Sequence, residues 1–518
     1  KDKTIFIGPD VWSDDNPSPY FIENRTLLKK WLLEAELPEG VDVRVGRWDI
    51  PGRPIVILVK FDGMYAVKDE FYGRMWQLYG VDSLHAYGDY DEACSFSHAA
   101  GIVAKSLFSF YKAHGLVSDR QKPRFISHYD EWTTGMGLLY IKAECPEAAT
   151  VFTTHATSIG RSICGNGKPL YDRLPYYNGD QMARELNMES KHSLEKAAAL
   201  QADCFTTVSE VTARECGQLL GRRPDIVTPN GFENNFVPSA SKFADARAAA
   251  RSKMLSVASS LTGHSFDDNT FIVVTSGRCE YRNKGIDLFL DSMTHMSYDN
   301  LDRPVLAFVM VPAWVDKARP DLTIALDDKA LKRLSDPVIT HTLHNYNSDP
   351  VINRIHQIGF INDADARVSV IYVPCYLNGA DGIFDMTYYD LLPGFDASVF
   401  PSYYEPWGYT PLESVAFGVP TVTTSLSGFG QWILDTFTDS FAACGVRVEK
   451  RTDSNYDEVC ERISDDIASL VNNAQAELKK ISKAAKATAK SAAWSNFISY
   501  YITAFDIALA NADARNKK

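Results

Sequence analysis

Short apolar runs alternate with longer segments of helical periodicity along most of the chain. The apolar runs are nearly continuous, which is typical of strands that are buried on both faces of a parallel sheet. Helical patterns follow most of them, for example over residues 195–201 and 285–293. This alternation predicts an α/β fold, and in such folds ligands bind at the carboxyl ends of the strands. The expected strands are residues 4–8, 54–61, 124–128, 150–155, 204–208, 270–276, 305–311, 368–373, 397–400 and 420–424.

The organisation into domains follows from the length of the chain and from one break in its pattern. A chain of 518 residues is too long for a single hydrophobic core, so at least two domains are expected. Pro229-Asn230-Gly231 is a turn signal, and a polar, helix-prone stretch over residues 238–268 separates it from a second α/β pattern. We therefore predict domains over residues 1–230 and 231–475, and C-terminal helices over residues 476–518 that pack back on the first domain.

The C-terminal segment carries two side-chain patterns of helices. An apolar stripe at i, i+3, i+4, i+7, i+11 and i+14 predicts that the last helix buries one face. It consists of Trp494, Phe497, Ile498, Tyr501, Phe505 and Ala508. A lysine stripe on the preceding helix is either a solvated face or an anion site, and charge runs are more often solvated. It consists of Lys479, Lys483, Lys486 and Lys490.

Charge and cysteine content argue against several classes of protein. The formal net charge of −13 is unfavourable for binding nucleic acid or an anionic membrane, so we expect neither partner. The nine cysteines are scattered without a C-x-x-C motif, which argues against a disulfide framework or a zinc site and is typical of a reducing compartment. The sequence shows no signal peptide and no membrane-spanning apolar run, and a cytoplasmic location is expected.

The first candidate site follows the predicted strand 397–400 and contains two carboxylates, Glu405 and Glu413. Thr410, Pro411 and Glu413 have the spacing of N-cap, N1 and N3 in a capping box, which predicts that a helix starts here. Its free N–H groups and positive dipole end would suit a diphosphate. On this pattern Glu413 is more often a cap than a ligand, whereas Glu405 lies in the loop without such a structural role.

Two further pairs of polar residues come at or after predicted strands. Arg278 and Lys284 are six residues apart in a strand-to-helix loop. A guanidinium and an ammonium could stabilise the charge on a departing nucleoside diphosphate, although a surface ion pair is the commoner reason for such a spacing. His155 and Arg161 are also six residues apart. A single histidine at a strand end is more often part of the core, but the arginine could reach the same cleft.

Several of these segments resemble the eukaryotic-type glycogen synthase family. The similarity runs in order from the start of the chain to about residue 435, and the diverged regions lead us to expect a bacterial member. The matching segments are Y-Y-E-P-W-G-Y-T-P-x-E (403–413), G-V-P-T-V-T-T-S-L-S-G-F-G (418–430), S-G-R-x-E-Y-R-N-K-G (276–285), F-T-T-H-A-T-S-I-G-R (152–161), F-T-T-V-S-E-V-T-A-R-E (205–215), P-N-G-F (229–232) and D-P-V-I-N-R-I-H-Q-I-G-F (349–360).

The resemblance implies a GT-B fold, in which two Rossmann-like domains face each other across a cleft. It implies transfer of glucose from UDP-glucose to the non-reducing end of an α-1,4-glucan such as glycogen, with retention and without a metal or other cofactor. The D-x-D triplets Asp89/Asp91 and Asp363/Asp365 are then solvated loops, and a homo-oligomer is expected. The rival hypotheses are another GT-B enzyme, similar to trehalose-phosphate synthase, sucrose synthase or phosphorylase, and an inactive glycan-binding protein.

Roles of individual residues are carried over from the matching motifs. The resemblance implies that Arg278 and Lys284 bind the diphosphate and that Glu405 lies beside the donor glucose at the reacting centre. His155 and Arg161 would contact the sugar and the diphosphate from the first domain. The other implied donor-binding residues are Glu413 at the ribose, Tyr388 at the uracil, and Thr410 with its neighbours Trp407, Gly408 and Tyr409 at the phosphates.

Two features of the family are missing from the sequence. The family begins with K-x-G-G-I-Y-x-V, a strand and glycine loop over the donor phosphates, whereas this chain opens on Lys1-Asp2-Lys3 and matches from Ile5. We expect the natural protein to carry the missing piece. Animal and fungal members also bind glucose 6-phosphate through an arginine-rich helix. The matching residues 478–494 contain lysines but no arginine, so weak or absent activation is predicted.

Overall fold

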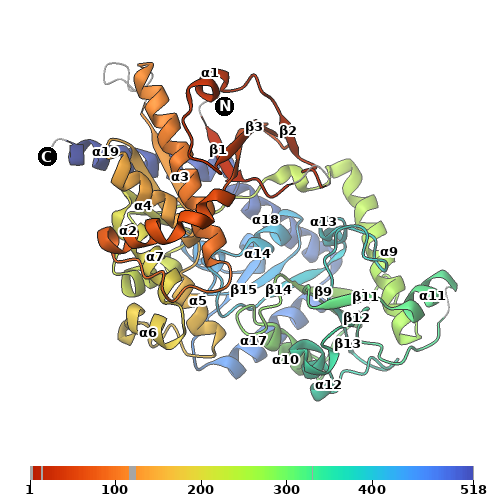
Figure 1. The fold of residues 1–518 in the computed structure, drawn as a ribbon. Helices are drawn as coiled ribbons and strands as arrows, with labels where there is room; N and C mark the ends of the chain where they lie inside the picture. The colour runs from red at the N-terminus through yellow and green to blue at the C-terminus, as the bar shows by residue number, and fades with distance from the viewer. Residues whose placement is uncertain (1–3, 13–15, 116–123, 329–330, 517–518) are drawn as a thin grey trace.

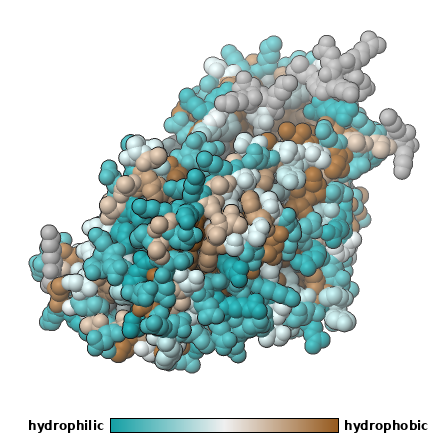
Figure 2. All heavy atoms as spheres, turned by 180° about the vertical axis from the view of Figure 1, so that it is seen from behind, coloured by the Kyte–Doolittle hydropathy of each residue, from teal (hydrophilic) through white to brown (hydrophobic). Residues whose placement is uncertain are grey.

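The computed structural model describes residues 4–12, 16–115, 124–328 and 331–516, and Lys1-Asp2-Lys3 lie outside these ranges. Two α/β halves lie beside each other, and the last helix, α19 (Trp494–Asn516), returns to the first half (Figure 1). Polar side chains cover most of the face in Figure 2, with apolar groups scattered between them.

The first half contains two four-stranded sheets. Its strands are β1 (Ile5–Pro9), β2 (Phe21–Glu23), β3 (Asp42–Trp48), β4 (Ile55–Lys60), β5 (Ile126–Asp130), β6 (Ala149–Thr154), β7 (Cys204–Thr207) and β8 (Ile226–Val227). In the sheet β5-β6-β7-β8 all neighbours are parallel, as predicted. In the sheet β1-β4-β3-β2 only β1 and β4 are parallel, and β3 runs antiparallel to both of its neighbours.

The sequence pattern does not predict β2 and β3, and the expectation of purely parallel strands is wrong for them. Strand β3 carries Arg44 between its two valines and Arg47 after them, and Asp42 and Arg44 are exposed. Such a strand lacks the continuous apolar run of a strand buried on both faces. Its edge neighbour β2 has three residues and no buried one.

The second half has one six-stranded parallel sheet with the order β13-β10-β9-β14-β15-β16. Its strands are β9 (Phe271–Ser276), β10 (Val305–Met310), β13 (Val368–Val373), β14 (Ala397–Phe400), β15 (Thr421–Thr424) and β16 (Val446–Glu449), with a separate antiparallel pair of β11 (Val315–Ala318) and β12 (His341–Leu343). From β9 the chain first builds one side of the sheet and then, from β14, the other. The gap between β9 and β14 is therefore the switch point at which ligands of open α/β sheets bind.

Helices cover the faces of these sheets (Figure 1). In the first half they are α1 (Lys29–Glu34), α2 (Lys68–Tyr79), α3 (Tyr90–Ala113), α4 (Gly135–Glu144), α5 (Ser158–Gly165), α6 (Gly179–Glu185), α7 (Glu189–Gln201) and α8 (Glu210–Glu215). In the second half and the C-terminal segment they are α9 (Ala240–Thr262), α10 (Ile286–Met296), α11 (Pro320–Asp328), α12 (Pro350–Ile358), α13 (Tyr388–Leu391), α14 (Tyr409–Ala416), α15 (Gly428–Thr436), α16 (Phe441–Cys444), α17 (Tyr456–Val471), α18 (Gln475–Ser491) and α19.

The chain crosses between the halves twice, and the two crossings lie side by side. The N–H of Phe232 donates to the carbonyl of Ala492 at 3.0 Å, and that of Trp494 donates to the carbonyl of Phe232 at 3.4 Å. A Cβ at Gly231 would lie 2.7 Å from the backbone nitrogen of Trp494, so only glycine allows this approach. Any movement of one half relative to the other must change the conformation of these paired segments.

Helix α19 packs on the parallel sheet of the first half. Its buried alanines Ala504, Ala508 and Ala512 meet residues of β6 and β7. The predicted apolar stripe is partly wrong, because Ile498 is 49% exposed. The small residues decide which face is buried, since alanines let a helix approach a sheet closely.

A buried charge cluster fixes the end of α19. Asp203 accepts hydrogen bonds from Lys142 Nζ at 2.9 Å and from the backbone N–H of Thr150 at 2.9 Å, and it also pairs with Arg515 of α19. The side chains of Lys142 and Asp203 are 9% and 4% exposed. Neither charge could remain here without the other, because an unpaired ion in a protein interior is strongly destabilising.

None of the described helices combines the length and apolarity needed to cross a membrane. All nine cysteines lie in the described part of the chain and are free thiols, eight of them buried.

The first prediction concerns stability. Asp203→Ala should lower the free energy of unfolding by about 3 kcal/mol, because it leaves Lys142 buried without a counter-ion. The measurement is urea unfolding followed by far-UV circular dichroism, in which the first transition should move to lower urea.

Asp513→Ala is the matched control on α19. Asp513 pairs with Arg124 at 3.1 Å, but its side chain is 52% exposed, so a change below about 0.5 kcal/mol is expected. Equal losses in the two variants would contradict the assignment of the buried cluster as the anchor.

Candidate active site

Two loops meet at the switch point of the second half, one after β9 and one after β14. The first contains Arg278 and Lys284, and the second contains Glu405. Gly285 ends the first loop with φ 66° and caps α10, and a Cβ on it would collide with the backbone of Pro401. Because nothing larger than glycine fits, the two loops are in direct backbone contact.

An ion pair and two backbone hydrogen bonds join these loops. Lys284 Nζ binds the carboxylate of Glu405, and the two side chains are only 15% and 13% exposed. The N–H groups of Tyr403 and Tyr404 both donate to the carbonyl of Asn283, at 2.9 and 3.0 Å. The positions of the lysine and the glutamate are therefore set together.

Two arginines from different halves share one carboxylate oxygen of Glu280. Arg278 Nε lies 3.2 Å from Glu280 Oε1, and Arg161 Nη1, from α5 of the first half, donates to the same atom at 3.1 Å. The Arg278 side chain is 62% exposed and that of Arg161 is 34% exposed. Glu280 is not among the site residues predicted from the sequence, although an acidic residue between two expected cations could have indicated it.

His155 lies at the end of β6 in the facing half. Its Nε2 is 3.1 Å from a carboxylate oxygen of Asp130, and its backbone N–H donates to Glu131 at 3.0 Å. Burial acts to lower the pKa of His155, but the hydrogen bond and charge of Asp130 outweigh it and raise that pKa. Its side chain is 37% exposed, so the alternative of a core histidine does not hold.

The predicted capping box at the start of α14 is wrong. The helix begins at Tyr409, with Gly408 as N-cap at φ 110° and no side-chain cap. Glycine at a left-handed φ turns the chain before Thr410, so Thr410 lies inside the first turn and Glu413 is too far along to reach the N-cap. Glu413 instead accepts a hydrogen bond from the Tyr389 hydroxyl at 2.7 Å, and burial raises its pKa.

A cavity of about 630 Å³ opens between the halves at the carboxyl ends of β15 and β16. Tyr171 and Arg214 line it from the first half and Gln431, Glu449 and Arg451 from the second. Arg451 also donates to the carbonyl of Pro401 and so borders the Glu405 loop. None of the site residues predicted from the sequence, all of which lie in the described ranges, lines this cavity, so it neighbours the switch point without being part of the predicted site.

Comparisons with known proteins identify the family. The sequence matches the family described as glycogen synthase over residues 22–332 and 322–516. The chain belongs to the glycogen synthase family.

Individual relatives agree with this assignment. The chain is 30% identical over 490 residues to the liver glycogen [starch] synthase of Homo sapiens, covering 83% of this chain and 68% of that one. It is 29% identical over 531 residues to glycogen [starch] synthase isoform 1 of Saccharomyces cerevisiae, covering 89% and 73%.

A solved structure supports the fold. The catalytic domain of Starch Synthase IV from Arabidopsis thaliana, bound to ADP and acarbose, matches with a TM-score of 0.52 and 14% identity, over 97% of this chain and 92% of that one. The expected α/β, GT-B architecture is confirmed.

Two aromatic residues of the predicted donor site, Tyr388 and Trp407, lie in different surroundings. The Tyr388 hydroxyl lies 2.7 Å from Ser276 Oγ at the end of β9. Trp407 is 4% exposed, and its ring contacts Phe429, Trp432 and Phe497. The structure therefore brings Tyr388 to the switch point, whereas Trp407 is part of an aromatic core beneath it.

Other polar clusters consist of residues outside the predicted site. Asp89 pairs with Lys191 at 2.7 Å and Asp363 with Arg333 at 3.1 Å. Among the described residues, His341, Cys375 and Asp381 have ligand atoms within 4.8 Å of one another. The His341 Nε2 lies 3.1 Å from the Asp381 carbonyl, and the Asp381 carboxylate accepts backbone N–H groups of the following turn.

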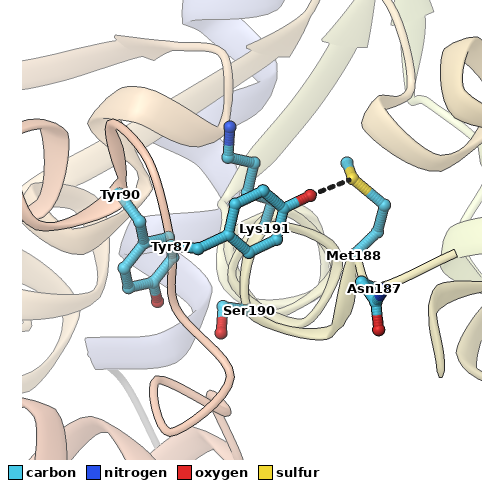
Figure 3. Close-up of a pocket in the computed structure, with 6 residues that line it drawn as sticks. All are labelled: Tyr87, Tyr90, Asn187, Met188, Ser190 and Lys191. Carbon is cyan, nitrogen blue, oxygen red and sulfur yellow. Dashed lines mark hydrogen bonds between the residues drawn. The ribbon is translucent and has the colours of Figure 1, made fainter.

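The small depression in Figure 3 is not a candidate site. It lies between the start of α3 and α7, where the Tyr87 hydroxyl is 3.6 Å from the sulfur of Met188. It leaves no room for a water-sized sphere.

The second prediction concerns the charge of His155. Asp130→Asn should lower the pKa of His155, because the variant keeps an acceptor oxygen but removes the charge that opposes burial. The measurement is an NMR titration of the histidine ring signals. An unchanged His155 pKa in the variant would show that Asp130 does not control this group.

Proposed function

We propose that this protein transfers a glucosyl group from UDP-glucose to the non-reducing end of an α-1,4-glucan, with retention of configuration and without a metal. The observation that carries the proposal is the convergence of Lys284, Arg278 and Arg161 at the switch point, where the strand ends and the α14 N-terminus also meet. Membership of the glycogen synthase family supports the reaction class.

The three cations suit a diphosphate leaving group. Breaking the glycosidic bond builds negative charge on the phosphate oxygens, and fixed guanidinium and ammonium groups stabilise that charge. Arg278 and Arg161 both pair with Glu280, so a diphosphate can take over the same two donors. Because Arg161 belongs to the other half, the bound diphosphate would bridge the two halves in place of Glu280.

The α14 N-terminus offers a second set of donors to the diphosphate. No side chain caps it, so the N–H groups of Tyr409 and Thr410, which follow Gly408, can serve an anion. Deeper in the same region we assign Glu413 to the ribose and Tyr388 to the base. Trp407 packs in the aromatic core beneath the switch point and supports the loop that carries Glu405.

The transfer proceeds by same-face attack. The acceptor 4-hydroxyl attacks the anomeric carbon on the face from which the phosphate departs, and the departing phosphate oxygen takes its proton. Glu405 lies beside the donor glucose and His155 faces it from the first half, so both orient the sugar. The Asp89 and Asp363 carboxylates are already engaged by Lys191 and Arg333, and the proposal gives them no part in the reaction.

The third prediction tests these roles. Arg278→Ala and Lys284→Ala should each lower turnover by about a hundredfold or more, the scale of losing one preorganised donor to a developing anion. The assay is transfer of glucose from UDP-glucose to glycogen, with folding checked by circular dichroism.

Arg282→Ala is the matched control in the same loop. Arg282 is exposed, and it is not assigned to the diphosphate, so turnover within about twofold of the parent is expected. Near-normal turnover in both Arg278→Ala and Lys284→Ala would overturn the assignment of the diphosphate site.

The fourth prediction concerns glucose 6-phosphate. Of the lysines on α18, Lys486 lies 3.8 Å from the centroid of the Phe243 ring, and burial lowers its pKa, while Lys479, Lys483 and Lys490 are exposed. Ammonium groups dispersed in this way lack the planar fork that binds phosphate in two places. Millimolar glucose 6-phosphate should leave activity unchanged within about twofold, and a severalfold rise would contradict this expectation.

A further inference from the structure

Tyr404 belongs to the second half by sequence but is buried in the first. It precedes Glu405 in the loop after β14, and it is 2% exposed. Apart from Tyr404, every buried member of its hydrophobic cluster comes from the first half: Ala156, Ile159, Ile163, Cys164, Leu170, Met182, Ala183 and Leu219. The side chain of Tyr404, a residue of the second half, is therefore buried in a hydrophobic cluster of the first half.

The hydroxyl of this tyrosine meets a buried carboxyl group. Tyr404 Oη donates to Glu215 Oε2, at 3.1 Å, and lies 3.3 Å from the carbonyl of Thr157. Glu215 is 1% exposed, and its other contacts are the hydroxyls of Thr157 at 2.9 Å and Tyr171 at 3.5 Å. Burial raises the pKa of Glu215 to about 7, and among the described residues no cation pairs with it.

The fit around this hydrogen bond is close. A Cβ at Gly160 would lie 2.6 Å from Glu215 Oε2 and 3.4 Å from Tyr404 Oη. Gly160 lies in the first turn of α5, the helix that also carries Arg161. The carboxyl group, the tyrosine and the Arg161 helix therefore occupy one packed unit.

The same short segment reaches both loops of the active site. The backbone N–H groups of Tyr403 and Tyr404 donate to Asn283, the residue before Lys284, and the next residue, Glu405, pairs with Lys284. Tyr404 therefore contacts the first half with its side chain and the loop that carries Lys284 with its backbone. If the halves separate, Tyr404 must leave its pocket, and Glu215 loses the donor that comes from the second half.

We propose that Tyr404 is a positioning residue which, through its hydrogen bond to Glu215, couples closure of the two halves to the placement of Glu405 and Lys284. The inference rests on the proposed function of those two groups. The hydroxyl of Tyr404, and not only its ring, holds the Glu405 loop in the geometry used for transfer.

The fifth prediction follows from Tyr404→Phe, which keeps the ring and removes the hydroxyl. We expect kcat for glucosyl transfer to fall about tenfold, the effect of losing a hydrogen bond to a buried carboxyl group, with the UDP-glucose KM within about twofold. Glu215→Leu combined with Tyr404→Phe should lower kcat no further than the larger single effect, because either change alone already removes the hydrogen bond between Tyr404 and Glu215.

Tyr171→Phe is the matched control. It removes a hydroxyl from the same carboxyl group, but Tyr171 belongs to the first half, so kcat should stay within about twofold of the parent. Equal losses in Tyr171→Phe and Tyr404→Phe, or a normal kcat in Tyr404→Phe, would overturn the proposal.

A readout independent of activity separates this inference from the proposed function. In hydrogen exchange followed by mass spectrometry, Tyr404→Phe should speed exchange in peptides that cover residues 277–285 and 401–408, whereas Tyr171→Phe should not. Faster exchange in a protein that transfers no glucose would refute the proposed function and leave the coupling in place. Unchanged exchange in those peptides, in an active enzyme, would refute the coupling alone.

Discussion

The ion pair between Lys284 and Glu405 joins the two loops on which the site depends. Each charge is nearly buried, and each would be costly to keep there without the other. The pair also links two strands, β9 and β14, between which the strand order of the sheet reverses. A phosphate oxygen that approaches Lys284 competes with Glu405 for the ammonium, so donor binding and the position of the glutamate are coupled by charge alone.

A second constraint acts across the cleft. Arg161 and Arg278 belong to different halves and share Glu280, while Tyr404 is buried against Glu215. These contacts, together with the paired crossings at Phe232 and Ala492, define the closed arrangement in which the cations converge. In an acidic chain with a net charge of −13, this local group of cations is the place where we propose that an anionic donor binds.

The sequence pattern predicts the buried strands well because residues covered on both faces form continuous apolar runs. All ten predicted strands are present, with ends displaced by at most two residues. Strand β3 is missed because its arginines interrupt the run. The start of α14 is misplaced because Gly408 turns the chain before the threonine that has the spacing of a cap.

The site is predictable only in part. Glu405, Arg278 and Lys284 follow predicted strands, and topology then requires them to meet. Glu280, Asn283, Tyr404 and Glu215 were not predicted as site residues, because their roles arise from contacts between segments far apart in the sequence. Trp407 was predicted as a site residue from its motif, but its ring is part of the aromatic core beneath the site.

The most direct test is an assay of transfer of radiolabelled glucose. UDP-glucose and ADP-glucose are supplied separately as donors, each with glycogen, glucose 6-phosphate or fructose as the acceptor. The account predicts label in glycogen from UDP-glucose, with release of UDP, and no labelled product from the other two acceptors. Transfer to glucose 6-phosphate or fructose, or binding of glycogen without turnover by the full-length protein, would contradict it.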